Sequence, residues 1–242
     1  MITAETSTVP VRSSAHVVAD IVGREAETYA VGPKRKLDAA VAVVALAAFA
    51  PVLVVLALAI KLESRGPVFF KQTRIGIERR RERGTAPDGP ERRRVIHPGR
   101  PFQILKLRTM TRDAEADGPR WATPGDSRMT RVGRFLRASH LDEFPQFVNV
   151  LRGEMSVVGP RPERLCFMRD LEEAVPRYRE RLAVLPGITG LAQVVNGYDT
   201  DVESVRRKVA LDRRYIDSLC LRTDLEIMAR TVKVLAAGKG TH

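Results

Sequence analysis

Residues 39–60 read AAVAVVALAAFAPVLVVLALAI, and none of these 22 residues is charged or strongly polar. At about 1.5 Å per residue, a straight helix of this length would reach roughly 33 Å, which is enough to cross the hydrocarbon core of a bilayer. The stretch therefore predicts a membrane-embedded helix in the first quarter of the chain.

Two features of the apolar stretch argue against a simple crossing. Pro51 removes a backbone hydrogen bond in mid-helix, and so kinks or breaks it. Both flanks are basic, with Lys34, Arg35 and Lys36 before the stretch and Lys61 and Arg65 after it. Because basic flanks prefer the cytoplasmic side, we predict that residues 34–62 enter the membrane, bend at Pro51 and return as a re-entrant helix hairpin. A kinked transmembrane helix and a buried helix of a soluble core are the alternatives.

The composition of the 242-residue chain excludes several classes of protein. Lys and Arg number 41 against 29 Asp and Glu, a formal net charge of +12, and the hydrophobic share of 44% is that of a folded chain. Two cysteines exclude a disulfide scaffold and indicate a reducing compartment, while four scattered histidines without a CxxC motif offer zinc few ligands. Aromatic residues make up 5%, which argues against nucleic acid read by base stacking. A membrane surface or a phosphate-rich substrate suits the positive charge.

Charge and turn signals divide the chain into three parts. Residues 1–33 hold two arginines against four acidic residues and lack the basic start of a signal peptide, so we interpret them as a flexible cytoplasmic tail. The re-entrant helix follows, and residues 63–242 form a cytoplasmic body. Within it, residues 78–100 hold eight arginines around a Pro-Asp-Gly turn signal. This Arg-rich insertion either rests on anionic lipid headgroups or is a solvated loop.

Residues 102–108 alternate apolar and polar side chains, a pattern typical of a β-strand. Because alternate residues of a strand share a face, Lys106 and Arg108 are predicted to lie together. Two neighbouring cations suit an anionic ligand, although a pair that faces solvent is the more common case.

The stretch around Asp142 and Glu143 is the most informative part of the body. Phe144, Phe147 and Val148 are spaced as on an amphipathic helix that continues to residue 151. Since proline is tolerated only in the first turn of a helix, Pro145 predicts a helix that begins near Asp142 and ends before residue 153. Carboxylates at a helix start are stabilised by the helix dipole, which lowers their pKa values, and the same position attracts phosphate. Asp142 is therefore either a simple N-cap or, with the arginines upstream of it, part of a phosphate-handling site.

Two features near the C-terminus complete the pattern. Asp212 falls on the apolar stripe of a helix, where a carboxylate is costly unless it is paired or functional. A structural ion pair and a functional role are both open at this point. The last helix carries Leu225, Met228, Val232 and Leu235 at amphipathic spacing, and it packs on the core or on a membrane surface.

Taken together, the motifs resemble those of the bacterial sugar transferases, the monotopic phosphoglycosyl transferases that start glycan assembly on a polyprenyl phosphate. The matching stretches, in family order, are 34–38 (KRKLD), 66–76 (GPVFFKQTRIG), 102–110 (FQILKLRTM), 141–146 (LDEFPQ), 153–163 (GEMSVVGPRPE), 186–193 (PGITGLAQ) and 211–216 (LDRRYI). The chain departs from the family in its long Arg-rich insertion and at Leu185, where the family often has a basic residue. It looks like a minimal catalytic form with a short tail.

The resemblance implies an α/β, mainly helical fold with a re-entrant membrane helix hairpin and a compact cytoplasmic catalytic body with amphipathic interfacial helices. The implied reaction moves a sugar 1-phosphate from a UDP-sugar to polyprenyl (undecaprenyl) phosphate with Mg²⁺, and releases UMP. It belongs to the first membrane step of exopolysaccharide or lipopolysaccharide assembly, at the cytoplasmic face of the bacterial inner membrane. The expected partners are these two substrates and membrane lipids, with no nucleic acid.

The family's Asp-Glu dyad falls on Asp142 and Glu143. The resemblance makes Asp142 the nucleophile that forms a phosphosugar-aspartyl enzyme, and gives Glu143 a role with Mg²⁺ or with protons. Asp142 and Glu143 are also the residues expected at the metal. It also implies substrate contacts from further residues, namely Lys106, Arg108, Arg137, Arg161 and Asp212.

Two other function classes remain at this stage. A non-catalytic basic scaffold that holds anionic lipid or nucleic acid would explain the charge, but it would not need Asp142 and Glu143. A membrane-spanning glycosyl transferase would release UDP instead of UMP, so the nucleotide product separates it from the favoured reaction.

Overall fold

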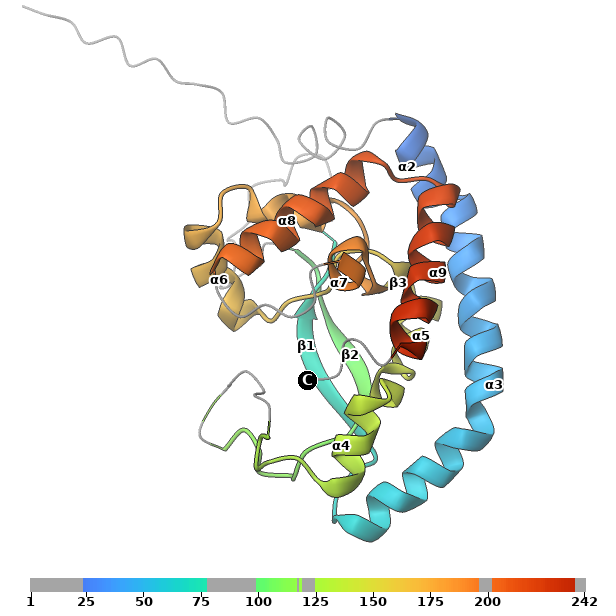
Figure 1. Cartoon of the computed structure of the whole chain (residues 1–242), viewed down its shortest axis with the longest axis vertical. Coiled ribbons are helices and arrows are strands. Elements are labelled where there is room, and N and C mark those ends of the chain that lie inside the picture. The colour runs from blue at the N-terminus through green and yellow to red at the C-terminus, as the bar shows by residue number, and fades with distance from the viewer. Residues whose placement is uncertain (1–23, 78–98, 117, 119–124, 196–201, 238–242) are drawn as a thin grey trace, which may run out of the picture.

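Helix α3 (Pro33–Glu63) runs along one side of the molecule and contains the whole apolar stretch (Figure 1). The computed structural model describes residues 24–77, 99–116, 118, 125–195 and 202–237. Within these residues, α3 together with the short helix before it is the one candidate membrane helix by length and hydropathy. Only 17% of its most apolar 18-residue window is buried. This exposure disfavours a soluble core helix, which would be covered by the rest of the fold.

Pro51 lies inside α3 without ending it. The helix changes direction in its second half (Figure 1), as expected where a proline removes a backbone hydrogen bond. On the inner side, Phe49 stacks on Phe144 with ring centroids 4.4 Å apart, and Leu56 and Ile60 are buried. The outer side carries exposed valines and leucines. The re-entrant topology itself stays a prediction.

Helix α2 (Arg24–Val31) lies within the segment predicted to be a flexible tail. Its Tyr29 hydroxyl donates a 2.8 Å hydrogen bond to Asp224 on α9 (Leu221–Ala236), and Ala26 and Ala30 pack against the main core. Regular structure therefore begins before residue 34, where partly buried side chains of α2 pack against the core and Tyr29 bonds to α9. Residues 1–23 lie outside the described part of the chain.

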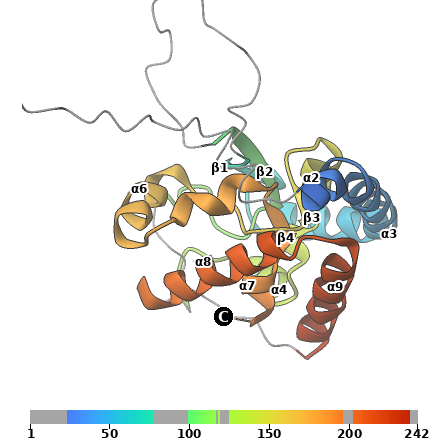
Figure 2. The ribbon, with the colours of Figure 1, turned by 90° about the horizontal axis from the view of Figure 1, so that it is seen from above.

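Two small sheets lie between the helices (Figures 1 and 2). Strands β1 (Phe69–Ile75) and β2 (Pro101–Leu107) pair in antiparallel register, with Phe69 opposite Leu107. The strand predicted over residues 102–108 is confirmed, with both ends shifted by one residue. Strands β3 (Ser156–Val158) and β4 (Gly187–Thr189) pair in parallel. The Arg-rich insertion joins β1 to β2 and, apart from Gly99 and Arg100, lies outside the described residues.

The rest of the body is helical, so the predicted mainly helical class is confirmed. The further elements are α4 (Arg131–Ala138), η1 (Leu141–Glu143), α5 (Gln146–Leu151), α6 (Leu165–Ala174), η2 (Tyr178–Ala183), α7 (Leu191–Val195) and α8 (Val202–Asp217), where η denotes a 3₁₀ turn. The main core joins Ala42 of α3 to Ile104 of β2, Val150 of α5, Val157 of β3 and Ile216 of α8. Helix α3 is therefore packed on the body along part of its length.

Helix α9 is amphipathic, as predicted. Ile227 is buried and Met228 packs against the core, while Leu225, Val232 and Leu235 are about half exposed or more. An exposed apolar stripe of this kind suits a membrane surface, and that contact stays a prediction.

Candidate active site

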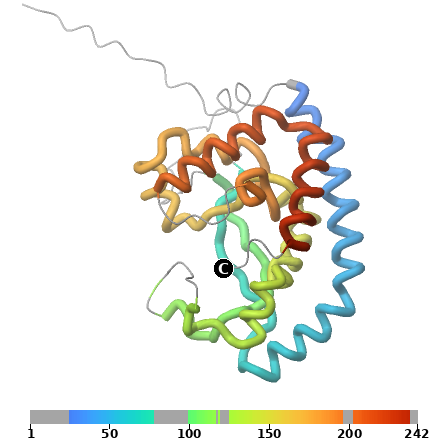
Figure 3. The backbone as a smooth tube through the Cα atoms, viewed as in Figure 1, coloured from blue at the N-terminus to red at the C-terminus, as the bar shows by residue number. Residues whose placement is uncertain are grey.

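The turn that carries Asp142 and Glu143 lies between α4 and α5. In Figure 3 this part of the backbone is the yellow-green section of the tube. Helix α4 ends at Ala138, and His140 adopts a left-handed conformation with φ 56°. Such a conformation is uncommon outside glycine and clusters at functional sites. His140 separates α4 from η1, which begins at the next residue.

The helix predicted to begin near Asp142 is split in two. Residues Leu141–Glu143 form the 3₁₀ turn η1, and the α-helix α5 begins only at Gln146. Proline has no N–H and cannot bond to the carbonyl four residues earlier, so the turn before Pro145 closes with tighter bonds, as from Phe144 N to Leu141 O. The predicted end is confirmed, because Gly153 follows α5 with φ 75°.

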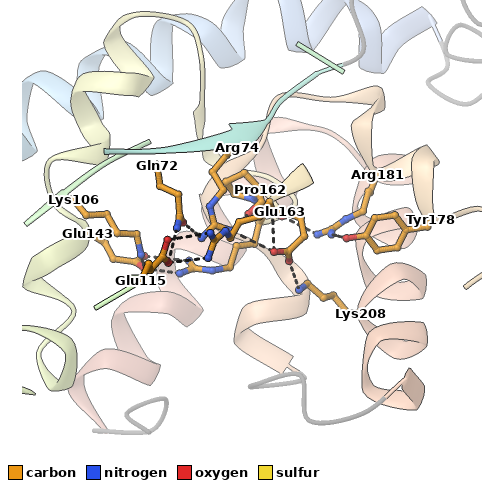
Figure 4. A network of polar contacts seen from close by, with 12 residues as sticks. Gln72, Arg74, Lys106, Glu115, Glu143, Pro162, Glu163, Tyr178, Arg181 and Lys208 are labelled. Atoms are coloured by element: carbon orange, nitrogen blue, oxygen red, sulfur yellow. Dashed lines mark hydrogen bonds and ion pairs between the residues drawn. The ribbon is translucent and has the colours of Figure 1, made fainter. Parts of the chain in front are cut away.

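Glu143 is held by two cations from different parts of the chain (Figure 4). The Nζ atom of Lys106 on β2 lies 2.7 Å from Oε1 of Glu143. Arg161, in the loop after β3, donates from Nη2 to the same oxygen at 2.5 Å and from Nη1 to Oε2 at 3.2 Å. Both carboxylate oxygens are therefore engaged, and the Arg161 side chain remains 36% exposed at the rim. We call Lys106, Glu143 and Arg161 the Glu143 cluster.

The two neighbouring carboxylates have opposite electrostatic environments. Burial raises the pKa of Asp142, which is 5% exposed, and the charge of Glu143 adds to the rise, while Lys106, Arg137 and Arg161 oppose it. Burial also disfavours the charge of Glu143, but Arg161 and Lys106 outweigh it and hold the pKa of Glu143 well below its usual range. The sequence argument expected low pKa values for both residues. It is wrong for Asp142, because desolvation exceeds the stabilisation offered at the helix start.

The other predicted site residues are distributed around this pair. Arg137, in the last turn of α4, acts on Asp142 through its charge. Arg108 is buried, and its guanidinium donates to the carbonyls of Ser64 and Arg65 at the end of α3 at 2.8 and 2.7 Å. The structure therefore brings Lys106 to Glu143 and uses Arg108 to attach the apolar helix to the strand.

Asp212 lies in a buried ion pair with Arg181 of η2, with 2.9 Å between Arg181 Nη2 and Asp212 Oδ2. The side chains of Arg181 and Asp212 are 3% and 2% exposed. Asp212 is therefore paired, as the structural interpretation expected, while its functional role is not tested by this contact. The predicted contact between Asp212 and a substrate stays a prediction.

Asn149 is a positioning residue that the sequence argument missed. It is fully buried on α5, where Nδ2 donates to Gln103 O at 2.7 Å and Oδ1 accepts from Leu105 N at 3.0 Å. These bonds fix α5 against the backbone of β2, and so fix Glu143 opposite Lys106. A polar residue between the apolar side chains of Val148 and Val150 was the available signal.

The donor set allows a limited test of the expected Mg²⁺. Among the described residues, no group of three or more His, Cys, Asp or Glu side chains is arranged to hold a metal ion. Mg²⁺ usually binds one or two carboxylates together with substrate phosphates, and the carboxylate of Asp142 fits this pattern. Lys106 and Arg161 engage both oxygens of Glu143, and the predicted role of Glu143 with Mg²⁺ stays a prediction.

These features define a class of protein: a mainly helical chain with one long, exposed apolar helix and a site of paired carboxylates among cations that suits a phosphate-bearing substrate. The chain belongs to the bacterial sugar transferase family, whose family model matches residues 29–83 and 87–238. The resemblance drawn from the motifs is thereby confirmed.

Curated relatives agree with this assignment. The chain is 40% identical over 209 residues to the UDP-N-acetylgalactosamine-undecaprenyl-phosphate N-acetylgalactosaminephosphotransferase of Aeromonas hydrophila, covering 86% of this chain and 45% of the relative. It is 46% identical over 206 residues to the UDP-glucose:undecaprenyl-phosphate glucose-1-phosphate transferase of Caulobacter vibrioides, covering 84% and 69%. It is 36% identical to the exopolysaccharide production protein PSS of Rhizobium leguminosarum, covering 86% and 97%. The chain thus spans less than half the length of the first of these relatives. Because two of the three relatives are named as enzymes that transfer a sugar phosphate, the alternative of a non-catalytic scaffold is not favoured.

Proposed function

We propose that this protein transfers a sugar 1-phosphate from a UDP-sugar to polyprenyl phosphate, the undecaprenyl form included, and releases UMP. Two relatives are named for a sugar-phosphate transfer to undecaprenyl phosphate. The observation that carries the proposal is the buried Asp142 beside the Glu143 cluster. A carboxylate can approach a diphosphate only where cations offset the repulsion between them, and Lys106, Arg137 and Arg161 supply that charge.

In the first half of the proposed reaction, a carboxylate oxygen of Asp142 attacks the β-phosphorus of the UDP-sugar. The bond from this phosphorus to the oxygen that bridges to the α-phosphate breaks, and UMP leaves. The sugar 1-phosphate remains on Asp142 as an acyl phosphate. The raised pKa of Asp142 makes its ionised form more basic than an ordinary aspartate, which favours it as a nucleophile as long as the pH keeps it ionised.

In the second half, a phosphate oxygen of the polyprenyl phosphate attacks the same phosphorus and frees Asp142. Arg161 and Lys106 stabilise the negative charge of the phosphate groups in both halves of the reaction, and Glu143 keeps these two cations in position. Asp142 is the candidate ligand for Mg²⁺, which would neutralise phosphate charge when bound together with the substrate.

The proposed acceptor explains why the body carries the apolar helix α3. A polyprenyl chain is dissolved in the bilayer, so the site must lie at the membrane surface. We propose that α3 is re-entrant, that the body lies on the cytoplasmic face of the bacterial inner membrane, and that Pro51 determines this topology. Arg108, which holds the end of α3 to the strand that carries Lys106, links the membrane helix to the site.

The covalent step is tested by mass spectrometry after the enzyme and a UDP-sugar are mixed with Mg²⁺ and without lipid acceptor. We expect a sugar-phosphate adduct on the peptide that contains Asp142, one equivalent of UMP at most, and neither in Asp142→Asn. UMP that forms only when both substrates are present would contradict the covalent intermediate. Release of UDP instead of UMP would contradict the reaction itself.

The topology is tested by labelling a single cysteine at position 14 in intact cells, after Cys166 and Cys220 have been replaced. We expect residue 14 to be protected in the otherwise wild-type chain and labelled in Pro51→Leu, because a straight helix would carry the tail across the membrane. Labelling of the wild-type tail from outside would rule out the re-entrant helix.

A further inference from the structure

The loop that carries Arg161 is held through its backbone at three consecutive residues. The carbonyl of Arg161 accepts from Nη2 of Arg181 at 2.9 Å, and the carbonyl of Pro162 accepts from Nη1 of Arg74 at 3.1 Å. The carbonyl of Glu163 accepts from the backbone N–H of Ile75 at 3.0 Å. Three separate donors therefore fix the backbone of residues 161–163. We call this stretch the Arg161 loop, and its Arg161 side chain reaches Glu143.

Arg181 is the more buried of the two arginine donors, and its guanidinium contacts three groups at once. Besides the Arg161 carbonyl, it donates from Nη1 to the Tyr178 hydroxyl at 2.8 Å and from Nε to Asp212 Oδ2 at 3.1 Å. Figure 4 shows Arg181 and Tyr178 pointing toward each other, at the opposite end of the polar network from Lys106 and Glu143. Because Asp212 and Tyr178 fix the plane of the guanidinium, the donor that reaches Arg161 has one available direction.

The geometry gives Arg181 a role beyond that of a core ion pair. We propose that Arg181, oriented by Asp212 and Tyr178, is a positioning residue that holds the Arg161 loop so that the Arg161 side chain meets Glu143 and the substrate phosphate. This inference rests on the proposed function, in which Arg161 acts on the phosphate groups. It assigns Asp212 an indirect role through Arg181 and Arg161.

A second buried ion pair provides the matched control. Lys34 and Asp224, with side chains 5% and 1% exposed, pair at 2.6 Å, and the hydroxyl of Tyr215 donates to Asp224 at 2.8 Å. This group resembles Arg181, Asp212 and Tyr178 in burial and in chemistry, but the Tyr215 hydroxyl contacts the carbonyl of Val158 on β3 and not the backbone of residues 161–163. A purely structural role predicts the same consequences for both groups, whereas positioning predicts a loss of activity for one.

The test is a double-mutant cycle measured as kcat/KM for the UDP-sugar, with UMP release as the readout. Arg181→Lys keeps the charge but cannot reach three partners in one plane, so we expect kcat/KM to fall roughly 10- to 100-fold through misplacement of Arg161. In an Arg161→Ala background, Arg181→Lys should cause no further loss, because the residue through which it acts is gone. Losses that multiply, or a wild-type kcat/KM in Arg181→Lys, would overturn the inference.

A milder pair of variants covers the case in which Arg181→Lys does not fold. Tyr178→Phe and Tyr215→Phe each remove one hydroxyl from a buried ionic group, and thermal melting checks that both are folded. We expect Tyr178→Phe to lower kcat/KM roughly 2- to 10-fold, the ratio typical of one hydrogen bond, and Tyr215→Phe to leave it unchanged. Equal effects from the two variants would contradict positioning. A wild-type enzyme that releases no UMP would contradict the proposed function and is recognised before any variant is compared.

Discussion

Two carboxylates in this protein are each surrounded by positive or hydroxyl donors, yet they lie in very different settings. Asp224 accepts from the Tyr29 and Tyr215 hydroxyls and from Lys34, and it is 1% exposed. Glu143 accepts from Lys106 and Arg161, and the Arg161 side chain is 36% exposed. The first group joins α2 and α3 to α8 and α9. The second group opens toward the surface beside the buried Asp142.

The comparison separates two uses of the same chemistry. Around Asp224, Lys34 and Tyr215 are buried and Tyr29 is partly buried. Burial and the carboxylate charge raise the pKa values of Tyr29 and Tyr215, so both stay protonated donors. Such a group has no capacity left for a ligand and serves to hold helices together. At Glu143 the cations retain an exposed side, so a phosphate group can share them. The accessibility of the donors, more than the presence of an ion pair, distinguishes the candidate active site.

The largest expected effect comes from exchanging a carboxylate for an amide in each region. Asp142→Asn should abolish turnover, with a loss of many powers of ten, because an amide cannot form the acyl phosphate. Its stability should be equal to or above that of the wild type, since burial of the Asp142 charge is unfavourable, as its raised pKa indicates. The measurement is UMP release together with a thermal melt. Substantial turnover by Asp142→Asn would contradict the assignment of the region around Asp142 and Glu143 as the active site.

The counterpart, Asp224→Asn, should give the reverse result. Removing one partner of a buried ion pair is expected to lower the free energy of unfolding by about 3–5 kcal/mol, because Lys34 stays buried and loses the carboxylate that lies 2.6 Å from it. Below the melting temperature of the variant, UMP release should continue near the wild-type rate. Unchanged stability, measured by denaturant unfolding in the same detergent, would show that the Asp224 group does not hold the helices.

The sequence allowed the local features of the site to be predicted, but not the contacts across the fold. Residues 102–108 alternate well enough to define a strand, and Pro145 and Gly153 mark the ends of a helical run, so Lys106 and Glu143 could be assigned to elements. Their pairing could not, because it depends on Asn149 docking α5 onto β2 from 46 residues away along the chain. The contacts of Arg108 with the end of α3 and of Arg181 with the Arg161 carbonyl are equally non-local. Periodicity indicates which face of an element a residue occupies, but it does not indicate which residues pack against that face.

The electrostatics of the site also required the fold. A position at a helix start predicted a low pKa for Asp142, and this was wrong, because the degree of burial cannot be read from a local motif. The paired cations that lower the pKa of Glu143 come from β2 and from the loop after β3. The sequence thus located the dyad, while tertiary packing gave its two members opposite environments.

The pH dependence of turnover tests the opposite pKa shifts of Asp142 and Glu143. The nucleophile must be ionised, so activity should be lost as the pH falls through the raised pKa of Asp142, at a higher pH than for an ordinary aspartate. Lys106→Met removes a charge that lowers this pKa and should move the acid limb of log kcat/KM to higher pH. Glu143→Gln removes a charge that raises it and should move the limb to lower pH. Shifts in the same direction for both variants would show that Asp142 does not set the limb.

The smallest expected effect is that of Tyr215→Phe on stability. The Tyr215 hydroxyl donates to Asp224 and also lies 3.0 Å from the carbonyl of Val158, so its removal takes one neutral-to-charged contact from an enclosed group. We expect the free energy of unfolding to fall by about 1–2 kcal/mol, which for a chain of this size is a decrease of roughly 2–8 °C in Tm. Tyr29 and Lys34 still bind Asp224, so the loss should be well below that of Asp224→Asn. If Tyr215→Phe were as destabilising as Asp224→Asn, the hydroxyl would be essential to the group, and the ion pair alone would not explain how α3 and α9 are joined.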